Sequence, residues 1–192
     1  QVEAMGATEP VLAQPRWTGQ PLNGETVLLY AEQGYGDTLQ FCRYVPMVAA
    51  AGGRVVLVEP RALRRVMATL DGVADLLSEE DDVPPPFDYH CPLLSLPAAF
   101  GSTMATIPAP IPYLRADPSP WVDFLDTLPR LKVGLVWAGL SRTAQPHAVA
   151  IDKRRSMRLA EMAPLFSVPG CDFVSLQLGE PAAHFIGDHG GQ

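Results

Sequence analysis

One short turn, Glu32-Gln-Gly-Tyr-Gly-Asp37, combines a carboxylate with glycines directly after an apolar segment. In an open parallel sheet, ligands bind beyond the carboxyl ends of the strands, where such turns lie. A carboxylate there can act as a general base if the hydroxyl it deprotonates comes within ~3 Å. Aspartate is also a favoured helix N-cap, worth ~1 kcal/mol. Spacing alone leaves Asp37 open to either role.

The same turn partly matches a dinucleotide-binding fingerprint. Gly34 and Gly36 supply two of its glycines, and Glu59 follows the next apolar segment, where an acidic residue would hold a ribose. Leu39 occupies the position of the third glycine. Moreover, Asp37 would place a negative charge at the helix N-terminus, where a pyrophosphate needs positive potential. The pattern therefore disfavours nicotinamide binding.

A second candidate site is basic. Five cations gather downstream of a buried segment that ends at Gly139, with only Asp152 opposing them: Arg142, Lys153, Arg154, Arg155 and Arg158. Loop amides and guanidinium groups together bind phosphate, so this region predicts an anion site. A solvated charged surface is the alternative explanation.

Composition narrows the function classes. The net charge of −7 disfavours a general nucleic-acid or anionic-membrane binder. The histidines and the three cysteines lack metal-ligand spacing, so no metal site is expected, and the cysteines predict reduced core residues of a cytoplasmic protein. No apolar run approaches the ~20 residues of a membrane span, and no signal sequence precedes the body.

The elements that would position these residues alternate between strand and helix. Apolar runs at 26–31, 54–58 and 132–137 predict buried strands, with weaker strands at 74–77, 87–91 and 172–176. Helical spacing follows Asp37, with Pro46 expected to kink or shorten that helix, and helices are also expected over 63–70, 121–128 and 159–166. Short β-α-β connections require parallel strands, which predicts an α/β, Rossmann-like sheet.

Three regions follow from this order. We expect residues 1–25 to form a polar lead-in, which is the segment before the first strand, with Trp17 and Leu22 anchoring it onto the first lobe. Residues 26–130 predict a first Rossmann-like lobe. Residues 131–192 predict the start of a second Rossmann-like lobe, which we expect to be incomplete because such a lobe needs more strands. An unfinished sheet edge predicts pairing with another copy of the chain.

Taken together, several segments resemble a known family. They are Tyr30 to Pro46 (YAEQGYGDTLQFCRYVP), His90 to Pro97 (HCPLLSLP), Gly134 to Gly139 (GLVWAG) and Asp152 to Ser156 (DKRRS). They look like the glycosyltransferase domain that follows tetratricopeptide repeats in many bacterial proteins, which is related to the lipopolysaccharide heptosyltransferases. The likeness covers about residues 17 to 178.

The resemblance implies a GT-B architecture, with an acceptor bound by the first lobe and a nucleotide-sugar donor bound by the second. It assigns the role of catalytic base to Asp37, with Gly34 and Gly36 shaping the loop. It assigns donor phosphate contacts to Lys153 and Arg155, within the basic group that also holds Arg142. No metal or other cofactor is implied, because the nucleotide sugar is a substrate.

Two departures limit the expected activity. Leu140 stands where the family carries a polar Asn, and the later donor motif is absent before the sequence ends. We therefore expect part of a metal-independent, inverting sugar transferase that is weakly active or inactive by itself, with a glycan or protein as acceptor. The alternative is a non-catalytic Rossmann-like module that binds a glycan or a protein.

Overall fold

The computed structural model describes residues 12–80, 82–139, 154–179 and 181–182. The chain forms two compact units, Gln1–Asp117 and Pro118–Gln192, and each is described by itself. The boundary expected from sequence, between residues 130 and 131, lies inside the second unit.

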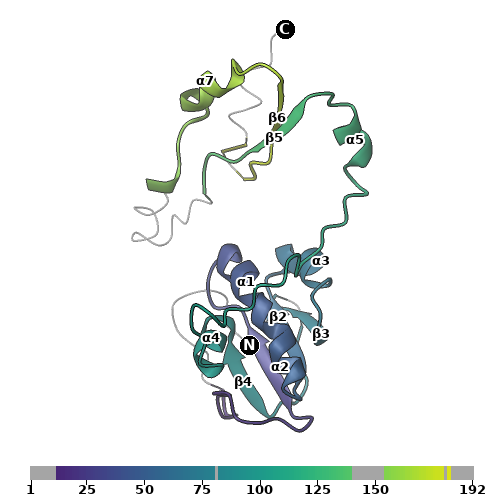
Figure 1. The fold of residues 1–192 in the computed structure, drawn as a ribbon, viewed down its shortest axis with the longest axis vertical. Helices are drawn as coiled ribbons and strands as arrows, with labels where there is room; N and C mark the ends of the chain where they lie inside the picture. Colours follow the sequence, from purple (N-terminus) through teal and green to yellow (C-terminus); the bar gives the residue numbers. More distant parts are fainter. Residues whose placement is uncertain (1–11, 81, 140–153, 180, 183–192) are drawn as a thin grey trace. The chain divides into compact units, whose positions relative to one another are not determined.

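The first unit is built on a parallel sheet. Its strands are β1 (Thr26–Tyr30), β2 (Arg54–Glu59), β3 (Val73–Ser78) and β4 (Tyr89–Pro92), arranged in the order β3-β2-β1-β4. All three strand pairs are parallel. The two central strands are almost wholly buried, as their apolar sequences predict. This confirms the expected Rossmann-like α/β fold of the first unit (Figure 1).

A broken helix connects β1 to β2. It consists of α1 (Tyr35–Phe41), a 3₁₀ turn η1 (Cys42–Tyr44) and α2 (Val45–Ala50). Pro46 lies in the first turn of α2, where its missing N–H has no helical partner to lose. The predicted interruption at Pro46 is therefore confirmed, and it falls just before the proline.

Shorter helical segments complete the first unit. The turn η2 (Arg61–Leu63) and α3 (Arg64–Met67) connect β2 to β3, and η3 (Leu93–Ser95) with α4 (Leu96–Ala99) follow β4. Leu63, Met67 and Leu70 of the expected apolar stripe are buried. After α4 the chain crosses the unit without a further described helix or strand up to residue 117.

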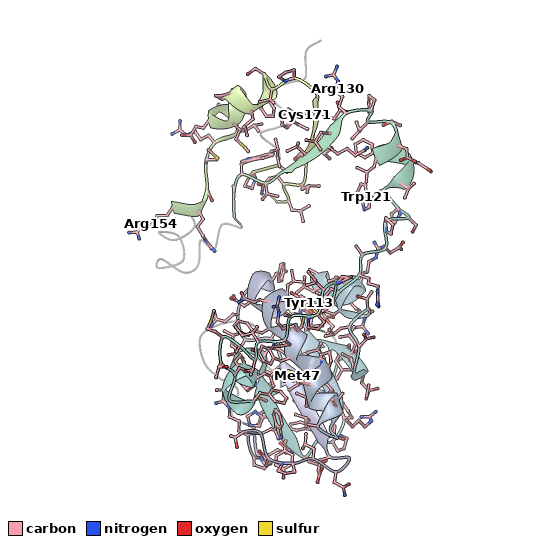
Figure 2. The ribbon with its side chains drawn as sticks, in the orientation of Figure 1. Met47, Tyr113, Trp121, Arg130, Arg154 and Cys171 are labelled. Carbon is pink, nitrogen blue, oxygen red and sulfur yellow. The ribbon has the colours of Figure 1, made fainter. Side chains whose placement is uncertain are left out.

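Two apolar clusters cover the two faces of this sheet. On the helical face, Leu29 and Leu57 pack with Val45, Val48 and Leu96. On the other face, the side chains of Leu28, Tyr30, Val56 and Val58 pack with those of Leu12, Leu77 and Phe87. Figure 2 shows the side chains around Met47 filling the helical layer of this unit. Burial of both faces holds β1 and β2 rigidly in the middle of the sheet.

The lead-in is anchored as expected. Trp17 is 1% exposed and its ring packs edge-on against Phe100, with the centroids 5.2 Å apart. Its indole N–H donates to the Gln20 carbonyl at 3.0 Å, and its backbone N–H donates to the His90 carbonyl at 2.8 Å. Leu22 is also buried. Trp17 and Leu22 therefore belong to the core of the first unit.

The second unit has two parallel strands, β5 (Leu131–Leu135) and β6 (Cys171–Ser175). Its helical segments are α5 (Val122–Asp126), the turn η4 (Leu159–Met162) and α7 (Ala163–Phe166). One face of the sheet carries a small core formed by Leu135, Trp137, Leu159 and Met162. Side chains on the other face are exposed, among them Val136 and Leu176.

The cysteines and the lengths of the helices bear on what was expected from composition. Cys42 and Cys91 are buried and not in disulfide bonds, which confirms them as core thiols, whereas Cys171 is half-buried. Burial raises the pKa of the Cys42 thiol to about 12, so it stays protonated. Within the described residues, every helix falls short of the length and apolarity that a membrane crossing requires.

Replacing Trp17 by Ala tests whether the lead-in is structural. We expect a loss of about 3–5 kcal/mol in the free energy of unfolding of the first unit, because a fully buried aromatic side chain leaves a cavity. Trp121, which is 59% exposed, supplies the matched control, and its replacement by Ala should change stability by less than ~1 kcal/mol. Urea unfolding followed by circular dichroism measures both, and equal effects would contradict the anchoring role.

Candidate functional site

The carboxyl ends of the four strands of the first unit all lie along one border of the sheet, its carboxyl edge. Tyr30 pairs with Val58 and with Pro92, and Glu59 pairs with Ser78 across β2 and β3. The turn Glu32 to Asp37 leaves β1 at this edge. The sheet therefore brings the Asp37 turn, Glu59 and the segment after Ser78 to the same end of the first unit.

Asp37 does not cap α1 as expected. The N-cap is Gly34, with φ −66° and ψ 169°, and Asp37 is the third residue of the helix. Its Oδ2 accepts a hydrogen bond of 3.2 Å from the Gly34 backbone N–H. Because glycine lacks a side chain, only this half of a capping box is present. The predicted N-cap position was wrong by three residues, since the helix begins earlier than the apolar periodicity indicated.

In this geometry one oxygen of the Asp37 carboxylate is available to a ligand. The side chain is half-buried, and among the described residues no hydrogen bond to its Oδ1 is found. One oxygen is thus fixed by the backbone while the other can accept a proton. A carboxylate oriented in this way suits a general base, because its position is set before a substrate binds.

The two glycines of the turn lie beside Asp37 and are exposed. Gly34 has an ordinary extended backbone, and an added Cβ would lie 3.6 Å from Asp37 Oδ2. Gly36 lies in the first turn of α1 with open space around its Cα. Neither glycine is required by backbone geometry or by contacts in this structure, so their expected role in shaping the loop stays a prediction.

Glu59 is a buried carboxylate at the same edge. It is 0% exposed, and within the described part of the chain neither carboxylate oxygen has a hydrogen-bond partner. Alternation along β2 places it on the helical face with Val55 and Leu57. Burial raises its pKa to about 7, against the opposing attraction of the Arg64 guanidinium. Glu59 therefore carries a proton well above the usual pH range of a glutamate.

The segment after β3 surrounds Glu59 with further acidic side chains. Glu79 is half-buried, its backbone N–H donates to the Glu59 carbonyl at 3.1 Å, and burial raises the pKa of its carboxyl. By contrast, the hydrogen bond from Ser78 lowers the pKa of Glu80. An acidic segment of this kind would ordinarily be a solvated loop, but Glu79 is half-buried. The signal that could have found the group is an acidic residue ending an otherwise apolar strand.

His90 is buried on β4 rather than lining a cleft. Its Nδ1 lies 3.3 Å from the Tyr30 hydroxyl, and the two rings stack with centroids 5.9 Å apart. The backbone N–H of His90 donates to the Pro15 carbonyl, which ties the lead-in to the edge of the sheet. The histidine therefore has a structural, hydrogen-bonding role in the first unit.

In the second unit, a pocket of about 410 Å³ lies at the carboxyl end of β5. Its wall includes Trp137, Ala138, Met157, Arg158 and Leu159. It follows the strand directly, in the position that ligands take in parallel sheets. The first unit and the second unit thus each carry a candidate site at the carboxyl end of their sheet.

A buried glutamine builds this end of β5. Gln177 Oε1 accepts the backbone N–H groups of Trp137 at 3.0 Å and Ala138 at 2.9 Å, and its Nε2 donates to the Ala138 carbonyl at 2.9 Å. Ser156 Oγ accepts the Gly139 N–H at 3.1 Å. Sequence reasoning missed Gln177, because a lone glutamine after a strand has no recognisable motif.

The structure places the predicted phosphate contacts only in part. Arg142 and Lys153 lie outside the described residues, and Arg155 is exposed and does not line the pocket. Arg158 does line it, with its backbone N–H held by Glu161 Oε2 at 2.6 Å. Figure 2 shows Arg154 and Arg130 at opposite ends of the second unit. Arg158 is therefore the cation that the described geometry brings to the candidate anion site.

Metal chemistry finds no support among the residues that can be described, where no group of three or more His, Cys, Asp or Glu side chains could hold an ion.

Replacing Glu59 by Gln tests the burial of this carboxyl. Because its pKa is 4.5 in the unfolded chain and about 7 in the folded unit, the wild type loses stability as pH rises between these values. We expect the variant to exceed the wild type by about 1–2 kcal/mol near pH 8 and to match it below about pH 4.5. Asp71 is exposed, so Asp71→Asn should leave the pH profile unchanged. Urea unfolding at several pH values decides, and a variant with the wild-type slope would refute the buried carboxyl.

Replacing Gln177 by Leu tests the clamp on β5. The amides of Trp137 and Ala138 would lose their acceptor, at a cost of about 1–3 kcal/mol for each buried unsatisfied group. We expect faster hydrogen exchange at these two amides, measured by nuclear magnetic resonance. The exposed Gln33→Leu variant is the control, and unchanged exchange in Gln177→Leu would show that the clamp is dispensable.

Comparison with known proteins gives a distant relative. The chain is similar to Protein FlbA of Caulobacter vibrioides, with 26% identity over 186 aligned residues that cover 86% of this chain and 30% of FlbA. The chain thus spans less than a third of the length of that relative. No family model matches the sequence. No solved structure matches it significantly.

Proposed function

We propose that this chain is part of a sugar transferase in which Asp37 deprotonates the acceptor hydroxyl. The observation that carries the proposal is the state of this side chain, which is held by one oxygen on Gly34 and keeps the other oxygen open at the carboxyl edge of the sheet. The ordered motifs that resemble the glycosyltransferase domain supply the reaction class.

The proposed transfer is a balanced displacement reaction at the anomeric carbon of the sugar. The acceptor oxygen attacks the anomeric carbon of a nucleotide sugar while the bond from that carbon to the phosphate oxygen breaks. The hydroxyl proton passes to Asp37, and the electron pair leaves with the nucleotide diphosphate. Attack opposite to the leaving group inverts the anomeric centre. Fixing the base in advance lowers the entropic part of the barrier.

The donor side of the proposal rests on the pocket after β5. Arg158 at its wall would stabilise the charge that develops on the departing diphosphate, and such stabilisation is a large part of catalysis. Trp137 and Met157 offer an apolar surface for the nucleotide base. Arg142, Lys153 and Arg155 remain proposed contributors to phosphate binding.

A binding module without catalysis is the second candidate. The open Oδ1 of Asp37 meets the need of a general base, and the motifs around it resemble those of the glycosyltransferase domain, so the enzyme is the first candidate. The binding module would instead use the apolar pocket described below, and it would keep its ligand when Asp37 loses its charge.

Asp37→Asn in the full-length gene product separates the two. The amide keeps an acceptor for the Gly34 N–H but cannot take a proton, so we expect sugar transfer to fall at least ~100-fold, as for loss of a general base. Stability should change by no more than ~1 kcal/mol, the usual value for a charge in the first helical turn. Transfer is measured with radiolabelled nucleotide sugars and a cell extract as acceptor. Asp71→Asn should transfer normally, and an active Asp37→Asn enzyme would exclude the proposed base.

A further inference from the structure

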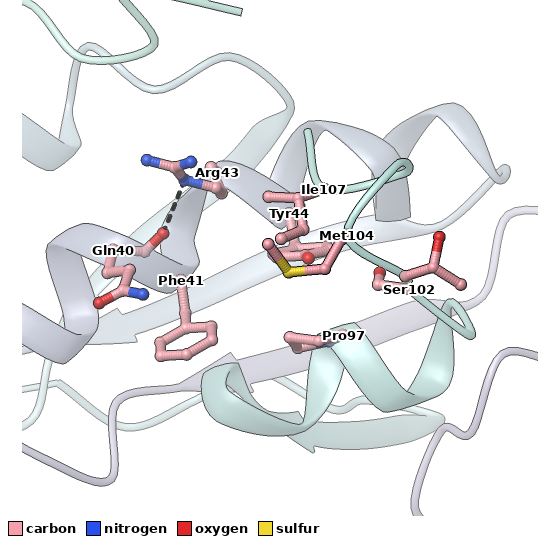
Figure 3. Close-up of a pocket in the computed structure, with 9 residues that line it drawn as sticks. Gln40, Phe41, Arg43, Tyr44, Pro97, Ser102, Met104 and Ile107 are labelled. Carbon is pink, nitrogen blue, oxygen red and sulfur yellow. Dashed lines mark hydrogen bonds between the residues drawn. The ribbon is translucent and has the colours of Figure 1, made fainter. Parts of the chain in front are cut away.

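A pocket of about 360 Å³ opens on the helical layer of the first unit (Figure 3). Its floor and walls come from three segments: α1 with η1, α4, and the chain from residue 102 to 107. The lining includes Gln40, Phe41, Tyr44, Pro97, Ser102, Met104 and Ile107.

The walls of this pocket are held by Arg43. Its guanidinium donates to the Pro108 carbonyl at 3.4 Å and to the Tyr113 hydroxyl at 3.1 Å, and it lies 4.6 Å from the centre of the Tyr113 ring. Its Nε donates to the Gln40 carbonyl at 3.0 Å. A turn closed by Thr103 and Thr106 shapes the outer rim. The cavity is thus formed before a ligand arrives.

The lining combines an apolar surface with two polar side chains that lack hydrogen-bond partners among the described residues. Phe41, Pro97 and Ile107 face the cavity, and Met104 at the rim is 90% exposed. The exposed amide of Gln40 has no side-chain hydrogen bond within the described part of the molecule, and the buried Ser102 hydroxyl has none there either.

This combination selects the class of ligand. An aliphatic or aromatic side chain would satisfy the walls but leave Ser102 and Gln40 without partners, which costs free energy. A pyranose ring presents C–H groups on one face and hydroxyls at its rim, and each hydroxyl can both donate and accept. A site with mostly apolar walls and a few polar groups is typical for a ligand of this size.

The pocket is also on the side of α1 that carries Asp37. Residues three and four positions apart share a helical face with their Cβ atoms ~5–6 Å apart, so Gln40 and Phe41 follow Asp37 on one surface. That separation of one helical turn is similar to the length of one sugar unit.

We propose that this pocket binds a pyranose unit of a glycan acceptor, next to the unit whose hydroxyl is presented to Asp37. The assignment of the ligand as an acceptor rests on the proposed function, whereas sugar binding itself does not. The pocket would then select acceptors by the sugar that precedes the reacting one.

Binding is tested on the intact chain with methyl β-D-glucopyranoside and methyl α-D-mannopyranoside as probes. The ¹³C-methyl resonance of Met104, assigned with Met104→Leu, should shift saturably with a Kd of roughly 1–10 mM. The resonance of the buried Met67 methyl group should not shift. Cyclohexylmethanol and N-acetyl-leucinamide serve as apolar comparators, and we expect weaker binding of both.

Matched variants locate the contact. Gln40→Ala should weaken pyranoside binding about five-fold, the effect of one hydrogen bond, whereas Gln33→Ala outside the pocket should not. Phe41→Leu keeps an apolar side chain and should weaken binding similarly, provided that its circular dichroism matches the wild type. No saturable shift with either pyranoside, or tighter binding of the apolar comparators, would overturn the proposal.

The outcome for pyranoside binding can be distinguished from the outcome for sugar transfer. Asp37→Asn should retain pyranoside binding at the pocket while losing sugar transfer. If that variant still transfers sugar, the catalytic role of Asp37 fails and the binding result stands. If it is inactive but the Met104 methyl never responds, the transferase stands and the sugar subsite fails.

Discussion

The parallel alignment of β1 with both of its neighbours is the constraint on which the first unit depends. It forces every strand to end at the same edge, so that residues far apart in sequence meet there. This alignment places Asp37, Glu59 and Glu79 at the same end of the sheet. Apolar packing on both sheet faces then prevents β1 from shifting its register, since a slip of one residue would exchange the two faces.

The same edge holds two carboxyl groups in opposite situations. Asp37 is half-buried with an oxygen open to a ligand, whereas Glu59 is sealed off and its pKa is raised by burial. Burial thus favours the protonated form of Glu59, which reduces the negative charge at this end of the sheet. In the proposed reaction, Asp37 is then the carboxylate at this end of the sheet that has an oxygen open to the acceptor hydroxyl.

Much of the fold could be predicted from the sequence because its signals are local. Apolar runs marked β1, β2 and β5, and Pro46 marked the break before α2. The position of Asp37 in the helix was missed by three residues, because exposed residues such as Tyr35 and Gly36 carry no periodic signal. The burial of Glu59 and the clamp by Gln177 depend on contacts across distant segments, which no local pattern contains. The pocket next to Arg43 could not be foreseen for the same reason.

The fastening of the 102–113 segment by Arg43 has a consequence for how this protein can change. One guanidinium holds the far end of that segment through Pro108 and Tyr113, while Met104 and Ile107 at the pocket contribute little to the core. Substitutions between these points can reshape the pocket without disturbing the sheet or the turn that carries Asp37. Under the proposed function, ligand choice and proton transfer would therefore evolve separately, on a common scaffold.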